Sequence, residues 1–245
     1  MDQQVLRTLK GFGSSKITIV EWETPLLRRL GYPLASNRDF IFLVPDNQLR
    51  KANDIATASG LKLAKDDDLP ASYVSEVAKQ GFRYVYGEPM NRFILVPLSW
   101  AGIERDELTA ITTTDRSLPC TIWTVPLPAI CAAYLRIITR ESRQSRVRLI
   151  AEGDLANIIA YSMLDMSYEV DYMDDEAVGI WEGTEDEAVL AKRAEKAKKA
   201  ALEMEDALND IRGWNFRTNE DWTRDTLIQL VSAKIDYEQL PSNQA

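Results

Sequence analysis

The chain has 245 residues, of which 45% are hydrophobic and 27% are charged, and this is the composition of an ordinary globular protein. Its formal net charge of −9 argues against a nucleic-acid-binding surface, which is normally basic. The absence of histidine excludes Ser-His-Asp and Cys-His nucleophiles and imidazole metal ligands. No apolar run approaches the ~20 residues that cross a bilayer, and the N-terminus has no apolar signal core. We therefore expect a cytoplasmic protein without nucleic-acid or membrane partners.

The first sixty residues alternate between helical and strand patterns. The expected elements are, in chain order, a helix over 2–10, a strand over 16–22, a helix over 24–31, a strand over 38–45 and a helix over 46–60. Thr24 and Asp46 are helix-capping residue types at the starts of their helices, and each is predicted to be an N-cap. The strand over 38–45 is apolar on both faces, which indicates a central position in a sheet.

Strand patterns continue through the first half of the chain and then give way to helical ones. Residues 82–87 and 91–100 predict a hairpin or two adjacent strands, and 120–126 predict one more strand. Helical patterns follow at 127–142, 148–176, 184–214 and 219–240. The sequence therefore predicts an α+β protein with a mixed-sheet α/β domain over residues 1–126 and a helical domain over 127–245 packed on it.

An isolated acidic residue, Asp39, opens an unbroken apolar strand that Pro45-Asp46 closes. The surrounding run, ITIVEWETPLLRRLGYPLASNRDFIFLVPDNQLRKANDIATASGL, resembles the nucleotidyltransferase-like superfamily, in particular a fungal branch with a small α/β domain followed by helices. The later run VPLPAICAAYLRIITRESRQS resembles the first C-terminal helix of that family. The resemblance covers residues 14–175 and implies a nucleotidyltransferase-like mixed sheet followed by a helical region.

The reaction of that family needs two divalent metals held by three carboxylates, two of them in an Asp-x-Asp pair. The resemblance places Asp39 at the first position of the pair and Ile41 at the second, and the later strand over 92–96 contributes no carboxylate. Glu21 and Trp22 stand where the family has a glycine-rich phosphate turn. The metal motif is therefore degenerate, and we predict neither a metal nor a cofactor.

A scaffold without these ligands favours catalysis by shape and hydrogen bonding. The resulting hypothesis is a metal-independent enzyme of fungal specialised metabolism that binds an apolar, terpenoid or polyketide-like small molecule. Its reaction would be a cyclisation or isomerisation, such as an intramolecular Diels–Alder cycloaddition. The predicted catalytic residues are Glu21, Arg38, Asp39 and Tyr84, and the predicted substrate-binding residues are Trp22, Tyr86, Trp100 and Trp123. Each of these aromatic residues also fits an ordinary core position.

Two alternatives stay open. The first is a nucleotidyltransferase or nucleotide-binding protein in which Asp39, with Asp46 or Glu88, rebuilds a metal site. The second is a non-catalytic binding or regulatory protein that uses the charged helix over 184–214 as a partner surface, although a solvated helix is the simpler interpretation of that charge. The basic run over 140–148 is interpreted as a solvated loop, with an anion site as its alternative. The sequence predicts no oligomeric state.

Overall fold

The computed structural model describes residues 2–32, 39–65, 68, 80–111, 119–165 and 187–243. The chain forms two compact units. One consists of Met1–Leu155 with Leu240–Ala245, and the other of Ala156–Gln239.

The contacts divide the chain inside helix α6 (Arg146–Met163), whereas the change of sequence pattern places a boundary between residues 126 and 127. The difference arises because helix α5 (Leu127–Arg140) belongs with the sheet. Its residue Tyr134 stacks on Trp22, at the end of a strand.

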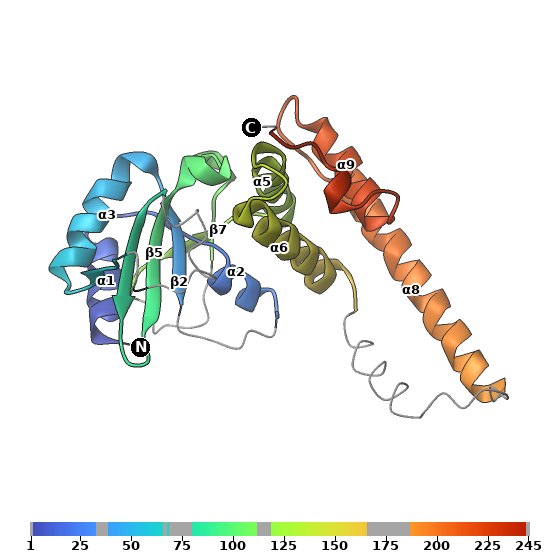
Figure 1. Ribbon diagram of the computed structural model, residues 1–245, viewed down its shortest axis with the longest axis horizontal. Coiled ribbons are helices and arrows are strands. Elements are labelled where there is room, and N and C mark those ends of the chain that lie inside the picture. The colour runs from blue at the N-terminus through green and yellow to red at the C-terminus, as the bar shows by residue number, and fades with distance from the viewer. Residues whose placement is uncertain are drawn as a thin grey trace. The chain divides into compact units, whose positions relative to one another are not determined.

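One seven-stranded mixed sheet lies in the described part of the first unit, in the order β3-β4-β5-β2-β1-β7-β6 (Figure 1). The strands are β1 (Ile19–Glu21), β2 (Phe40–Val44), β3 (Lys62–Leu63), β4 (Phe82–Tyr86), β5 (Asn91–Pro97), β6 (Thr109–Ala110) and β7 (Ile122–Thr124). β2 lies between the antiparallel β1 and the parallel β5, so its predicted central position is confirmed. β4 and β5 form the predicted antiparallel pair. The α+β class, a mixed sheet followed by helices, is confirmed.

Alternation along the strands gives the sheet two different apolar faces. One face packs on helices α1 (Gln3–Ser14) and α3 (Asp46–Ala58), where Phe42 and Phe93 share a core with Leu9. The alternate residues of β2, such as Ile41, point to the opposite face. Helices α2 (Thr24–Arg29) and α5 lie on that side (Figure 1). Short 3₁₀ helices follow β5 at Leu98–Ala101 (η2) and Arg105–Glu107 (η3).

Both predicted N-caps are wrong by one position. Glu23 is the N-cap of α2 and Thr24 its first helical residue, while Pro45 precedes α3 and Asp46 is its first residue. The Asp46 carboxylate is engaged elsewhere, because it accepts hydrogen bonds from the Ser99 backbone N–H at 3.2 Å and from the Ser99 hydroxyl at 2.5 Å. It therefore ties the start of α3 to η2.

The second unit consists of the end of α6, helix α8 (Glu187–Gly213), helix α9 (Asp221–Val231) and the 3₁₀ helix η5 (Tyr237–Gln239). α9 ends nine residues before the predicted limit of 240, where the chain turns through Ala233 at φ 53°. The predicted segment over 166–176 lies outside the described residues. No helix among the described residues is long and apolar enough to cross a membrane.

Candidate functional site

The turn between β1 and α2 holds Glu23 in an unusual backbone conformation. Its φ of 46° and ψ of −116° lie in a region that glycine adopts readily and that costs other residues about 1–3 kcal/mol. The conformation is imposed from both sides. Trp22 N–H donates to the Ile41 carbonyl at 3.1 Å, which continues the sheet, and Thr24-Pro25 already belongs to the helix. The chain therefore turns from β1 into α2 at Glu23 alone, and the backbone of this residue is strained.

Aromatic packing links this turn to α5. The Trp22 ring is only 1% exposed and stacks on Tyr134, with ring centroids 4.7 Å apart and planes 13° apart. It also meets Trp100 edge to face at 6.4 Å. The buried Tyr134 hydroxyl donates a hydrogen bond to Asp154 Oδ2 of α6 at 3.3 Å. One continuous chain of contacts therefore sets the position of Asp154 relative to β1.

Glu23 and Asp154 are half-buried carboxyl groups with raised pKa values. Burial raises the pKa of Glu23 from 4.5 to about 8, the charge of Asp154 raises it further, and Arg92 opposes the shift. Burial also raises the pKa of Asp154 from 3.8 to about 6, against the hydrogen bond from Tyr134. Burial thus disfavours the ionised form of both groups, and more strongly for Glu23 than for Asp154. Two neighbouring carboxyls with unequally raised pKa values can serve as an acid–base pair.

Asp39 has a fixed cationic partner. Its Oδ1 accepts the Arg92 backbone N–H at 2.9 Å and its Oδ2 accepts Arg92 Nη2 at 2.7 Å. The contact follows from the register of the parallel pair β2 and β5, in which Phe40 lies opposite Phe93. Arg92 thus stands on the later strand from which the resemblance implies a third metal-binding carboxylate. Asp39 is an ion-pair anchor, and its partner is Arg92.

Asp39, Asp46 and Glu88 are the carboxylates that the sequence offers as candidate metal ligands. Across the described ranges, no three Asp, Glu or Cys side chains gather as a metal ion would need. The Asp46 carboxylate accepts a hydrogen bond from the Ser99 hydroxyl. Glu88 is exposed in the turn between β4 and β5. The carboxylate at the first position of the expected motif, Asp39, is paired with the Arg92 guanidinium.

Glu21 is buried at the end of β1 and makes an ion pair with Arg29 of α2. Burial raises its pKa, while hydrogen bonds from Thr124 and Arg29 lower it. Arg29 Nη2 also donates to Thr124 Oγ1 at 3.1 Å, so the pair joins β1, α2 and β7. Arg38, another predicted catalytic residue, lies outside the described residues.

The sheet separates the remaining predicted residues. Tyr84 and Tyr86 are buried in the core beneath α1 and α3, where the Tyr84 hydroxyl donates to Asn53 Oδ1 at 2.8 Å and burial raises the pKa of Tyr84. Trp22 and Trp100 touch each other on the opposite face, and Trp123, whose register partner is Val20, alternates onto that face as well. The predicted aromatic residues therefore do not line one common site.

Sequence reasoning missed the groups that do come together, which are Glu23, Arg92, Tyr134 and Asp154. A weak signal existed for Asp154, because it is an acid beside buried apolar residues of α6, Leu155 and Ile158. The sequence around Glu23 did not indicate a functional residue, since the unusual φ of Glu23 is set by the packing of the neighbouring elements.

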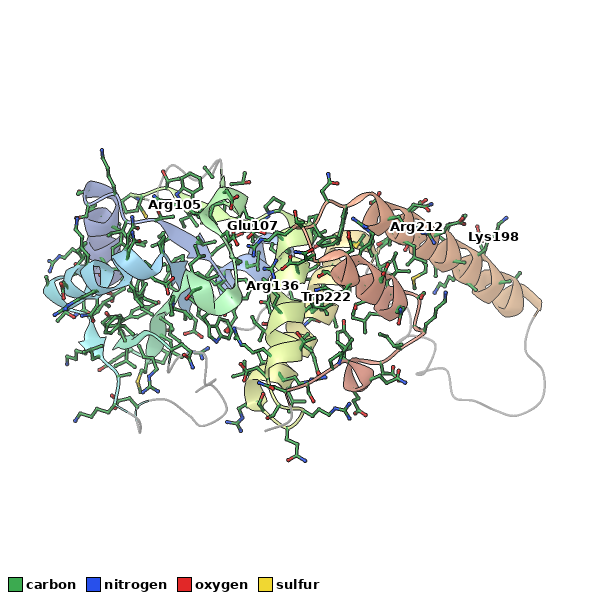
Figure 2. All side chains as sticks on the ribbon, turned by 90° about the horizontal axis from the view of Figure 1, so that it is seen from above. Arg105, Glu107, Arg136, Lys198, Arg212 and Trp222 are labelled. Atoms are coloured by element: carbon green, nitrogen blue, oxygen red, sulfur yellow. The ribbon has the colours of Figure 1, made fainter. Side chains whose placement is uncertain are left out.

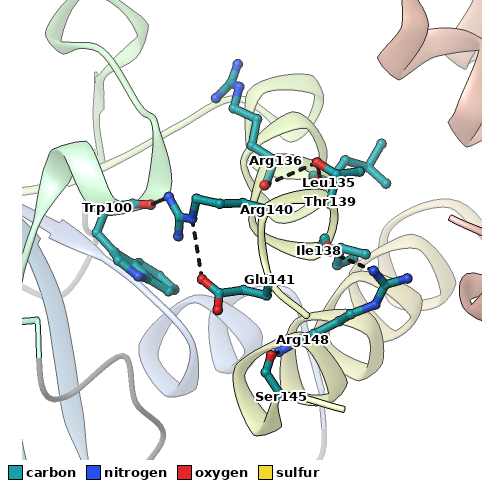
Figure 3. A network of polar contacts seen from close by, with 9 residues as sticks. All are labelled: Trp100, Leu135, Arg136, Ile138, Thr139, Arg140, Glu141, Ser145 and Arg148. Carbon is teal, nitrogen blue, oxygen red and sulfur yellow. Dashed lines mark hydrogen bonds and ion pairs between the residues drawn. The ribbon is translucent and has the colours of Figure 1, made fainter. Parts of the chain in front are cut away.

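The basic run over 140–148 is only partly solvated (Figure 3). Arg148 is 1% exposed and donates to Glu152, to the Ile138 carbonyl at 3.0 Å, and to the carbonyls of Leu240 and Pro241. Arg140 donates to the Trp100 carbonyl at 2.8 Å and lies 5.5 Å from the Trp100 ring centroid. The interpretation of the run as a solvated loop is wrong for Arg148, which is a structural residue.

No family model and no curated protein matches the chain. One similar solved structure is the solution structure of the antibiotic-resistance factor ANT(2'')-Ia, a nucleotidyltransferase. The two share 12% identity over 71% of this chain and 94% of the other, at a TM-score of 0.37. A likeness of this size carries no argument about activity, so function has to be inferred from the chain's own residues.

Proposed function

We propose that the chain is a metal-independent acid–base enzyme that isomerises or cyclises a small, largely apolar carbonyl compound. The observation that carries the proposal is the pair Glu23 and Asp154, two half-buried carboxyls from different elements whose pKa values of about 8 and about 6 bracket neutrality. Perturbed groups of this kind concentrate at functional sites. Strain at Glu23 supports the same assignment, because such backbone outliers cluster there too.

The pair can move one proton in each direction. The Asp154 carboxylate takes a proton from the carbon next to the substrate carbonyl, and the protonated Glu23 gives one to the carbonyl oxygen, which yields an enol. Return of a proton to a different carbon completes an isomerisation, and attack of the enol carbon on a second electrophilic carbon completes a cyclisation. Both reactions are redox-neutral and leave the two carboxyls in their starting forms after proton exchange.

The charge of the site favours a neutral substrate. At pH 7 Glu23 is neutral and Asp39 is compensated by Arg92, so Asp154 leaves a net negative charge. A triphosphate would be repelled by this charge. The neighbouring rings of Trp22, Trp100 and Tyr134 make the surroundings apolar. These features support the neutral-substrate enzyme over the nucleotide-binding alternative.

Within the class expected from the sequence, proton transfer is favoured over a cycloaddition. A cycloaddition would need aromatic side chains that together mould one pocket, and the predicted ones lie on both faces of the sheet. Terpenoid and polyketide-like ketones and aldehydes remain suitable probes, because they carry both an apolar body and an exchangeable position beside the carbonyl.

Deuterium exchange tests the proposal without knowledge of the final product. The full chain is incubated in D₂O and EDTA with each carbonyl compound, and loss of the proton beside the carbonyl is followed by NMR. We expect exchange by the native chain and a loss of about 100-fold or more in Glu23→Gln and in Asp154→Asn. Asp210→Asn, which neutralises an exposed carboxylate on α8, is the matched control and should exchange normally.

Exchange that survives both substitutions would contradict the assigned roles, and absence of exchange with every compound would contradict the activity. A shift in melting temperature with Mg²⁺-ATP, but with no carbonyl compound, would favour the nucleotide-binding alternative, because a ligand stabilises the native state that binds it.

A further inference from the structure

Helix α8 carries an apolar stripe that is only partly covered. Ala194, Ala197, Ala201, Met204, Leu208 and Ile211 recur at alternating spacings of three and four residues, which places them on one side of the helix. α9 lies beside the C-terminal part of α8, where Ala207 and Ile211 are buried (Figure 1). Ala194, Ala197 and Ala201 are exposed. α9 therefore accounts for the burial of only one half of α8.

A charged stripe follows the other side of the same helix. Lys196, Lys199, Glu203, Asp206 and Asp210 recur at the same alternating spacing, so two bases precede three acids. They are offset by two residues from the apolar stripe, which is about 200° around the helix axis. Figure 2 labels Lys198, near the middle of α8, and Arg212, near its C-terminal end. The charged stripe thus faces away from α9 and changes sign at its middle.

The change of sign coincides with an exposed apolar centre. Ala200, Ala201 and Leu202 separate the last base of the stripe from its first acid, and Leu202 is 54% exposed. The N-terminal half of α8 is basic although the whole chain carries a net charge of −9. A base-to-acid stripe is complementary to its own reverse, because an antiparallel copy brings acids opposite bases. A parallel copy would bring like charges together.

We propose that two copies of this chain associate through the charged stripes of their α8 helices, which lie antiparallel about a two-fold axis that passes between Lys199 and Glu203. In this arrangement Lys196 faces Asp206 of the second copy and Lys199 faces its Glu203, and the same pairs recur on the other side of the axis. The contact is isologous and closed, as two-fold interfaces are. The two Leu202 side chains are offset by about 3 Å along the helix axis and lie on the same flank of the contact, beside its centre.

Contacts within one chain do not prevent this pairing. Lys199 lies 3.2 Å from Asp165 and 3.8 Å from Glu203 of its own chain, and it is 53% exposed. Glu203, which is 23% exposed, also accepts the Asp165 backbone N–H at 3.3 Å. Partly exposed contacts of this kind contribute about 1 kcal/mol each, so they exchange for pairs with a second copy. The proposal concerns the second unit and is independent of the activity assigned to Glu23 and Asp154.

Charge-reversal variants test the proposed dimer, because two oppositely charged variants that dimerise weakly alone should dimerise with each other. Sedimentation velocity is measured on the full chain at low salt, over a range of concentrations. Lys196→Glu with Lys199→Glu makes the stripe wholly acidic at its centre, and Glu203→Lys with Asp206→Lys makes it wholly basic. We expect the native chain to dimerise, each double variant to dimerise at least about tenfold more weakly, and an equimolar mixture of the two variants to recover dimers. Added salt should weaken the native dimer.

The matched control is Lys10→Glu with Lys51→Glu, which changes the net charge equally through two exposed lysines of α1 and α3. It should dimerise like the native chain, and circular dichroism confirms that every variant keeps its helices. A native chain that is monomeric at all concentrations overturns the proposal. So do double variants that dimerise normally, and so does a mixture of them that stays monomeric.

Discussion

Glu23 has two features that lower the stability of the fold, a strained backbone conformation and a buried carboxyl group. Glycine would remove both, because it adopts φ 46° freely and has no carboxyl group. The backbone on either side of Glu23 is held by the hydrogen bond from Trp22 N–H to the Ile41 carbonyl and by the start of α2. Such a residue is understandable if its carboxyl group has a chemical role.

The first prediction is that Glu23→Gly stabilises the fold and abolishes activity. Release of backbone strain should outweigh the greater freedom of glycine in the unfolded chain, for a net gain of about 1 kcal/mol in the free energy of unfolding. Urea denaturation measures the gain, and deuterium exchange measures the loss of activity. A destabilised Glu23→Gly chain would mean that the side chain itself holds the turn.

The second prediction concerns the pH dependence of stability. Because the folded-state pKa of Glu23 is about 8 and its ordinary value is 4.5, the native chain binds more protons than the unfolded one between these values. Stability should therefore fall as pH rises from 4.5 to 8, by at most about 1.4 kcal/mol per pH unit for each such group. Asp154 adds the same trend between 3.8 and about 6.

Urea midpoints across this range measure the effect. Glu23→Gln should flatten the curve above pH 6, whereas Asp210→Asn, on the surface, should leave its shape unchanged. A native chain whose stability rises from pH 6 to pH 8 would contradict the raised pKa of Glu23.

At the scale of elements, the register of β2 against β5 decides what Asp39 does. The parallel pairing brings the residue before Phe40 beside the residue before Phe93, and these are Asp39 and Arg92. The sequence analysis named Asp39 as a candidate catalytic residue and did not name Arg92. The register between two strands separated by fifty residues depends on tertiary packing, which a local pattern does not contain.

The third prediction is a coupling between Asp39 and Arg92. In a double-mutant cycle of Asp39→Asn and Arg92→Met, we expect an interaction energy of about 1–2 kcal/mol, because either single change leaves a half-buried charge unpaired. Denaturation of the four chains gives the value. Additive effects would show that the two side chains do not support each other. Exchange activity should persist in Asp39→Asn, since Asp39 transfers no proton in the proposed reaction.

The fourth prediction tests the contact between α5 and α6. Tyr134→Phe keeps the ring that stacks on Trp22 but removes the hydrogen bond that lowers the pKa of Asp154. The Asp154 pKa should therefore rise above about 6, and stability should fall by about 1 kcal/mol. Carboxyl ¹³C NMR titration reads the pKa directly. An unchanged titration would mean that the hydroxyl does not position Asp154.

The order and type of elements could be read from local patterns, since β2 is apolar on both faces and α5 shows helical spacing. The candidate site could not, because its residues lie far apart in the sequence and meet only through the sheet. Trp22 illustrates the difficulty. Its size and its acidic neighbours suggested a ligand contact, yet the decisive fact is that α5 covers it.

At the scale of the whole molecule, the chain leaves the first unit within α6 and returns to it at Leu240. Arg148 binds the segment that returns to the first unit, because its guanidinium donates hydrogen bonds to the carbonyls of Leu240 and Pro241. It is buried, so these acceptors cannot be replaced by water without rearrangement.

The fifth prediction is that a chain ending at Gln239 loses about 3 kcal/mol in the free energy of unfolding of the first unit, because Arg148 loses two hydrogen bonds and the buried Leu240 side chain is removed. A chain ending at Ser242 keeps both carbonyls and serves as the control. Thermal denaturation of the two truncated chains compares them directly. Equal melting temperatures would show that the contact between Arg148 and residues 240–241 does not contribute to stability.

The return of the chain at Leu240 also makes the second unit a closed loop, held to the first at both of its ends. The terminal segment therefore meets Arg148 at an effective concentration fixed by the chain between them, and not by its intrinsic affinity alone. A single backbone cut anywhere between Ala156 and Gln239 would turn this intramolecular contact into a bimolecular one. The severed C-terminal fragment would then leave on dilution, and Arg148 would keep Glu152 and Ile138 as acceptors but lose the carbonyls of Leu240 and Pro241.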